Sequence, residues 1–166
     1  MTRITERVSR GAGVLLLALH ALPAVAQPAP ETFWRLIANL AAASTQGGKA
    51  VASQWPGTPF HVAGAGDMAS APLSLGAGLQ TVLAEVRLTE GDAVQLLVME
   101  LSGSCITPAD VTARYAQASN ADFPQPNNPD PVRYRRLEIE GVRVSFGFRG
   151  ALPGCLAHVV FNPQAH

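Results

Sequence analysis

The stretch Gly91–Tyr115, GDAVQLLVMELSGSCITPADVTARY, decides the fold, because a long apolar segment in it is followed at once by helix-start signals. Apolar residues occupy both alternating sets of positions over residues 93–101, so a strand there would be apolar on both faces. Such a strand belongs in the middle of a sheet. The stretch therefore predicts a central strand joined to a helix through Cys105.

The residues after Cys105 indicate where this helix begins. Thr107 is suited to the N-cap and Asp110 to the first turn, where the two side chains can form a capping box. Pro108 occupies the first helical position, where its missing N–H costs nothing. Ile106 and Val111 stand at the positions of a hydrophobic staple. We expect this helix to end near residues 118–120.

Further strands are indicated on both sides of this stretch. Residues 79–88 and 93–101 predict one hairpin, and residues 133–139 and 142–148 predict a second, with Glu140–Gly141 in its turn. In this register Ile139 faces Val142 and Tyr134 faces Gly147. Residues 156–161 predict the last strand.

The N-terminal part predicts one helix and little else. Aromatic and aliphatic residues recur at three- and four-residue spacing over 31–44, which predicts an amphipathic helix with a buried stripe. Residues 49–78 are rich in Gly, Ala, Ser and Pro, so we interpret them as a loop with a short strand at 60–63. The proline-rich segment 122–131 predicts an exposed loop. The fold class is therefore α+β: an antiparallel sheet of about five or six strands with two helices packed on it.

The first 26 residues have the pattern of a secretory signal peptide. Three arginines precede a short apolar run, and Ala24-Val25-Ala26 is a small-x-small cleavage site. Cleavage there would leave residues 27–166 as a single domain in the periplasm or outside the cell. No later apolar run reaches the roughly 20 residues of a membrane span, so we expect no membrane insertion after cleavage.

Charge and cysteine content narrow the classes of function. The signal peptide carries three of the 12 basic and one of the 12 acidic residues, which leaves the rest of the chain with a formal charge near −2. This balance gives no electrostatic reason to bind nucleic acid. Both cysteines, Cys105 and Cys155, lie in the exported part, and an even count in such a chain predicts a disulfide.

Two sets of residues are candidates for a functional site. Arg136, Arg143 and Arg149 would project from the outer face of the second hairpin, where guanidinium groups suit carboxylates and phosphates. Glu138 and Glu140 on the same face can neutralise part of this charge. The second candidate is the thiol of Cys105 just ahead of a helix, where the helix dipole lowers a thiol pKa.

The position of Cys105, with His158 on a later strand, resembles the general layout of papain-like cell-wall peptidases. That resemblance implies a hydrolase with Cys105 as nucleophile and His158 as base. It covers these two residues alone, and Ser104 stands where the bacterial members usually carry an aspartate. Cys155 is moreover available to oxidise Cys105 after export. The structural disulfide is therefore our main prediction for Cys105, and the hydrolase is the alternative.

Other catalytic signals are absent from the sequence. It has no Gly-x-Ser-x-Gly, His-Glu-x-x-His or Cys-x-x-Cys motif, and His61, His158 and His166 lack the spacing of metal ligands, so no metal or cofactor is predicted. We expect a non-catalytic binding or interaction module, such as an inhibitor, an immunity-type protein or an envelope accessory protein. Its partner would be another protein or an envelope component. A third hypothesis is an assembly protein that associates with itself through the doubly apolar strand.

Overall fold

The computed structural model describes residues 29–64, 67–121, 131–150 and 153–163. The predicted signal peptide and most of the proline-rich segment lie outside these ranges. The elements follow in the order α1 (Glu31–Ser44), α2 (Gly48–Gln54), β1 (His61–Gly64), β2 (Asp67–Ser70), β3 (Leu73–Gly76), β4 (Leu79–Leu88), β5 (Val94–Gly103), α3 (Pro108–Arg114), β6 (Ser119–Ala121), β7 (Arg133–Ile139), β8 (Val142–Arg149) and β9 (Cys155–Pro163).

The strands form one antiparallel sheet in the order β1-β2-β4-β5-β9-β8-β7-β6, and β3 pairs with β4 outside this order. The α+β class is confirmed, but the described residues form nine strands rather than five or six. β5 lies inside the sheet between β4 and β9, as its two apolar faces predict. The chain then passes through α3 to the far edge and returns to β5 through β6, β7, β8 and β9.

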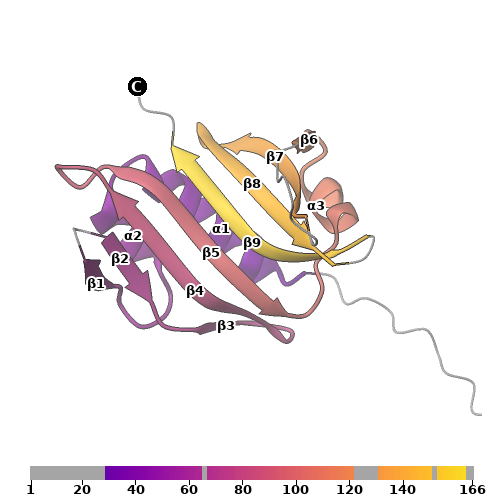
Figure 1. Ribbon diagram of the computed structural model, residues 1–166, viewed down its shortest axis with the longest axis horizontal. Helices are drawn as coiled ribbons and strands as arrows, with labels where there is room; N and C mark the ends of the chain where they lie inside the picture. Colours follow the sequence, from indigo (N-terminus) through magenta and orange to yellow (C-terminus); the bar gives the residue numbers. More distant parts are fainter. Residues whose placement is uncertain (1–28, 65–66, 122–130, 151–152, 164–166) are drawn as a thin grey trace, which may run out of the picture.

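The helices of the described residues, α1, α2 and α3, leave one side of the sheet without a helix over it (Figure 1). α1 and α2 lie behind the sheet in this view, and Val111 of α3 belongs to the same buried core as α1. We call the covered side the inner face and the uncovered side the outer face. The largest fully buried side chains include Phe33, Ile37 and Leu40 of α1 and the inner-face residues Phe146 and Phe161. The aromatic stripe of α1 is therefore core packing.

The junction after β5 has the structure that the sequence predicts. The Thr107 hydroxyl accepts a hydrogen bond from the Asp110 amide at 3.3 Å, and the Asp110 carboxylate accepts one from the Thr107 amide at 2.7 Å. Cys105 and Cys155 form a disulfide with their Cα atoms 4.9 Å apart. The Leu156 amide also donates to the Ile106 carbonyl at 2.8 Å. The end of β5 is thus tied to the start of β9 by a covalent bond and a hydrogen bond.

Two features of α3 and β4 differ from our expectations. α3 ends at Arg114 rather than near residues 118–120, because Tyr115 leaves the helical conformation and its ring packs against Trp34. A bulge between Thr81 and Leu83 also turns Val82 to the outer face, although simple alternation places it with the buried residues. Val82 is 46 % exposed as a result.

The segment before β4 contains more regular structure than we predict. The short strand expected at 60–63 corresponds to β1, but α2, β2 and β3 are additional elements. α2 begins at a contact with the β4–β5 turn, where the Asp92 carbonyl accepts from the Gly48 amide at 2.8 Å and its carboxylate accepts from the Lys49 amide at 3.2 Å. A Cβ atom at Gly47 would lie 2.9 Å from that carboxylate, so glycine is required for this approach.

Candidate binding face

The outer face of β7, β8 and β9 carries the basic residues that the sequence singles out. In an antiparallel sheet, residues opposite each other point to the same side. Arg136 pairs with Ser145, Arg143 with Glu138, and Tyr134 with Gly147, so these residues share the outer face, as the hairpin register predicts. We call the set Tyr134, Arg136, Arg143, Arg149 and His158 the basic face.

Arg143 and Arg149 have guanidinium groups without a bonding partner in the part of the chain that the structure describes. Within the described ranges, neither side chain forms an ion pair or a hydrogen bond, although Glu138 is the cross-strand neighbour of Arg143. The two ion pairs of the described residues, Arg87 with Glu85 and Arg114 with Glu31, lie elsewhere. The expected neutralisation by Glu138 is therefore not a direct ion pair, and both guanidinium groups can bind an external anion.

A small hollow lies beside Arg136 and Arg143. Its volume is about 210 Å³, and its other lining residues are Gln117, Ser119, Leu137 and Glu138. It opens at the edge of β7, beyond the end of the short strand β6. A carboxylate or phosphate group fits a space of this size. Arg133 does not contribute, since its guanidinium donates to the carbonyl oxygens of Gly150 and Pro153 at 3.0 and 3.4 Å.

The second part of the basic face is a pair of aromatic rings over a glycine. The Nε2 atom of His158 is hydrogen-bonded to the Tyr134 hydroxyl at 2.9 Å. A Cβ atom at Gly147, the residue between them in the sheet, would lie 2.2 Å from that Nε2 atom. Glycine at this position is therefore what allows the imidazole to reach the tyrosine across β8.

Burial and neighbouring charges change the proton affinity of both rings. Burial lowers the pKa of His158, the positive charge of Arg149 lowers it further, and Glu100 opposes the shift. Burial also raises the pKa of Tyr134, while Arg149 opposes that shift. Both rings are therefore neutral near pH 7. In a neutral imidazole protonated on Nδ1, Nε2 accepts the hydrogen bond and the tyrosine hydroxyl donates it.

The structure does not pair Cys105 with His158 as a thiol–imidazole dyad. The sulfur of Cys105 is bonded to Cys155, and the Nε2 atom of His158 is bonded to Tyr134. His158 instead faces Glu100 of β5 across the sheet. A papain-type mechanism requires a thiolate beside the base. The structure thus contains the predicted disulfide, and the hydrolase alternative would require reduction of that bond.

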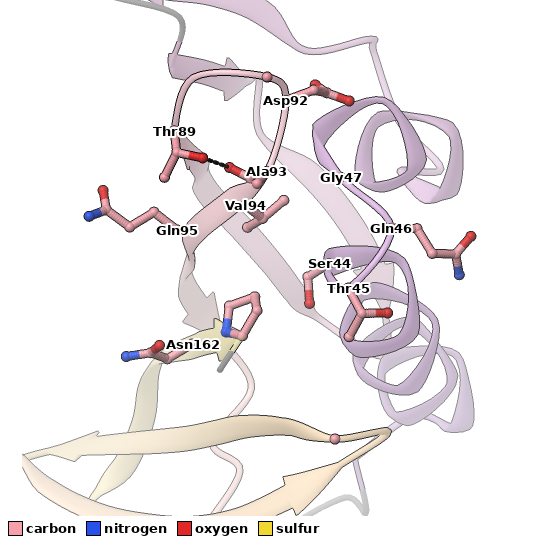
Figure 2. A pocket seen from close by; sticks show the side chains of 13 residues that line it. Ser44, Thr45, Gln46, Gly47, Thr89, Asp92, Ala93, Val94, Gln95 and Asn162 are labelled. Atoms are coloured by element: carbon pink, nitrogen blue, oxygen red, sulfur yellow. Dashed lines mark hydrogen bonds between the residues drawn. The ribbon is translucent and has the colours of Figure 1, made fainter. Parts of the chain in front are cut away.

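A larger pocket, shown in Figure 2, lies at the end of the sheet that holds the β7–β8 turn, and its lining residue Asn162 is the cross-strand neighbour of Arg143. Its volume is about 720 Å³, and it is lined by the C-terminal end of α1, the β4–β5 turn and the end of β9. Gln95 and Asn162 lie on its sheet side, across from Ser44 and Thr45. Its one charged lining residue is Asp92, whose carboxylate already accepts from the amide of Lys49. Its size makes this pocket a default candidate for a ligand site, but its described lining residues include no lysine, arginine, histidine or cysteine.

The arginines of the basic face follow from the hairpin register, but the role of His158 does not. Its contact with Tyr134 depends on the pairing of β8 with β9, in which Gly147 lies opposite His158. No signal near His158 in the sequence specifies this partner. The described residues contain no group of three or more potential metal ligands. None of the helices in the described ranges has the length and hydrophobicity of a transmembrane span.

Comparisons with known proteins assign no family. No protein-family model matches the chain, and neither the curated proteins nor the solved structures contain a significantly similar one.

Proposed function

We propose that this chain is an exported, non-catalytic binding module whose basic face contacts an acidic surface of another protein. The observation that carries the proposal is that the guanidinium groups of Arg143 and Arg149 have no ion pair or hydrogen bond among the described residues and lie on the side of the sheet that no described helix covers. Guanidinium groups bind carboxylates in bidentate geometry, so each can take one acidic side chain of a partner.

The spacing of these arginines favours a macromolecular partner. Arg143 and Arg149 are six residues apart on β8, which corresponds to about 20 Å along a strand. One small molecule would not reach both, whereas a protein surface can. Leu96, Val98 and Val160 lie on the same side of the neighbouring strands β5 and β9 and are partly exposed. A mixed apolar and basic face is typical of a protein interface.

The proposed localisation of the protein rests on two observations. Residues 1–26 have the signal-peptide pattern, and Cys105 and Cys155 form a disulfide, which persists in an oxidising compartment. We therefore place the protein in the periplasm or outside the cell. Intact mass of the exported protein should correspond to a chain that starts at Gln27 with both cysteines bonded. A protein that keeps residues 1–26, or has two free thiols, would refute this localisation.

Co-purification from an envelope extract tests the binding function. The bait is the wild-type protein, compared with Arg143→Gln, Arg149→Gln and the control Arg35→Gln. Arg35 is exposed on α1, away from the outer face. We expect a partner protein to co-purify with the wild type and with Arg35→Gln, but not with Arg143→Gln or Arg149→Gln. The partner should dissociate from the wild type as the salt concentration rises from about 0.05 M to about 0.5 M. Equal retention by all four proteins would exclude the basic face as the contact surface.

A further inference from the structure

The cluster around His158 has a property that the arginines alone do not have, since its charge depends on pH. His158 lies between Tyr134 on β7 and Glu100 on β5, with Arg149 on the strand between β7 and β9. Because Gly147 has no side chain, the tyrosine and histidine rings meet over it, with ring centroids 5.4 Å apart. An anionic group bound by Arg149 would therefore approach both rings.

Building on the proposed function, we propose that Arg149, His158 and Tyr134 hold one carboxylate of an acidic segment of the partner protein, and that His158 takes up a proton from solvent as it binds. The carboxylate would accept hydrogen bonds from the guanidinium of Arg149 and from the imidazolium of His158. Tyr134 would then stop donating to Nε2, because a protonated imidazole has two donors and no acceptor. Its hydroxyl can then donate to the carboxylate instead of to Nε2.

The charges that face His158 determine the direction of the pH effect. Arg149 on β8 opposes protonation, and Glu100 on β5 favours it. Tyr134 on β7 is neutral near pH 7, and in the tautomer with the proton on Nδ1 its hydroxyl stabilises the neutral ring by donating to Nε2. On β9 itself, the neighbouring Val160 carries no charge and Cys155 is in the disulfide. A bound carboxylate offsets the charge of Arg149, so it raises the proton affinity of the imidazole.

Protonation of His158 also makes the outer face more positive as the pH falls. On β5, β7 and β8 this face carries three arginines, Arg136, Arg143 and Arg149, against the two glutamates Glu100 and Glu138. Added to the charges of these three strands, protonation of His158 on β9 raises the balance from one positive charge to two. An acidic protein segment should therefore bind more tightly as the pH falls through the range in which histidine titrates.

Titration with an oligo-glutamate tests the proposal. A peptide of about ten residues is long enough, when extended, to span the two free arginines. Its carboxylates stay ionised between about pH 5.5 and about pH 7.5, so the charge of the peptide is constant. We expect the wild-type protein to bind it about threefold to tenfold more tightly at the lower pH. His158→Gln should bind equally at both, and His61→Gln, a control on the far edge strand, should behave as wild type.

Two further measurements distinguish a binding role from a structural one. Tyr134→Phe removes the hydroxyl that stabilises neutral His158, so the pH midpoint of the His158 ring signals in an NMR titration should rise. The wild-type midpoint should also rise when the oligo-glutamate is added. Midpoints that do not move in either experiment would overturn the proposal, whatever the stability of the variants.

The outcomes separate this inference from the proposed function. Binding that requires Arg143 and Arg149 but is the same at both pH values would overturn proton uptake by His158 and leave the basic face intact. Oligo-glutamate binding that is unchanged in Arg143→Gln and Arg149→Gln would overturn both the proposed function and the role of His158. If inorganic phosphate binds with this pH dependence and oligo-glutamate does not, the ligand is a phosphate group, and the assignment of a protein carboxylate is wrong.

Discussion

The two faces of the sheet differ in what their side chains contact. Phe146, on the inner face of β8, is fully buried, and its ring lies 6.3 Å from that of Trp34 and 6.0 Å from that of Tyr115. On the outer face of the same strand, Arg143 has no ion-pair partner within the described residues, and Gly147 leaves room for His158. Alternate residues of one strand thus have different surroundings.

We infer from this comparison that the inner face stabilises the fold, and we propose that the outer face binds a partner. Removal of inner-face contacts should unfold the protein, whereas removal of outer-face charges should leave the fold intact and change binding. A single strand therefore provides matched variants of both kinds. The predictions below start with the largest expected effect on the free energy of unfolding.

Phe146→Ala should lower the free energy of unfolding by about 3–5 kcal/mol, because it leaves a cavity where α1, α3 and β8 meet. Urea denaturation measures the effect. Val160→Ala, on the outer face of β9 and only partly buried, is the matched control and should cost about 1 kcal/mol or less. If the two variants cost the same, the outer face is as fully packed as the inner face and our comparison fails.

The disulfide should give the next largest effect. Cys105→Ser with Cys155→Ser opens a covalent loop whose ends are 50 residues apart in the sequence. We expect a loss of about 2–4 kcal/mol in the free energy of unfolding, mainly because the unfolded chain gains freedom. Reduction of the wild-type protein should produce a similar loss. Unchanged stability in both experiments would mean that the disulfide adds nothing to the stability that the hydrogen bonds between β5 and β9 already provide.

The N-cap of α3 should contribute less. Thr107→Ala removes one half of the capping box and should cost about 1 kcal/mol. Thr112→Ala is a suitable control, because the Thr112 hydroxyl donates to the Pro108 carbonyl within the helix and caps nothing. That variant should remain within about 0.5 kcal/mol of wild type. A larger loss from Thr112→Ala would show that the capping box is not the dominant local interaction.

The smallest expected effect is the pH dependence that His158 adds to stability. Burial lowers the pKa of His158 in the folded protein, so the unfolded chain binds its proton at a higher pH. The contribution of the neutral ring is therefore fully present above the ordinary histidine pKa of about 6.5 and decreases as the pH falls below it. Urea denaturation at several pH values should show a shallower acid slope for His158→Gln than for His61→Gln. Identical slopes would contradict the burial of the ring.

The sequence predicts the elements that local signals define. The capping box at Thr107 and Asp110, the disulfide and the 139–142 turn register are all confirmed. Each depends on residues close in sequence or, for the cysteines, on there being a single possible pair. The N-terminal helix is confirmed over 31–44 for the same reason, because its apolar stripe repeats within one segment.

The missed elements are held by distant contacts. α2 contains Gly, Lys, Ala and Ser with little periodicity, and its start is fixed by Asp92, which is 43 residues away from the Lys49 amide that it accepts from. α3 ends early because Tyr115 packs between Trp34 and Phe146, both far along the chain. Likewise, the pairing of His158 with Tyr134 appears only when β9 is placed beside β8. Local patterns contain no information on such partners.

The most direct test of the account combines binding and stability in one variant. Arg143→Gln with Arg149→Gln removes both free guanidinium groups of the outer face, and its affinity for the envelope partner or for oligo-glutamate is measured together with its thermal midpoint. We predict an affinity at least about tenfold weaker and an unchanged midpoint. Undiminished affinity, or a midpoint that falls as far as that of Phe146→Ala, would contradict the assignment of binding to the outer face.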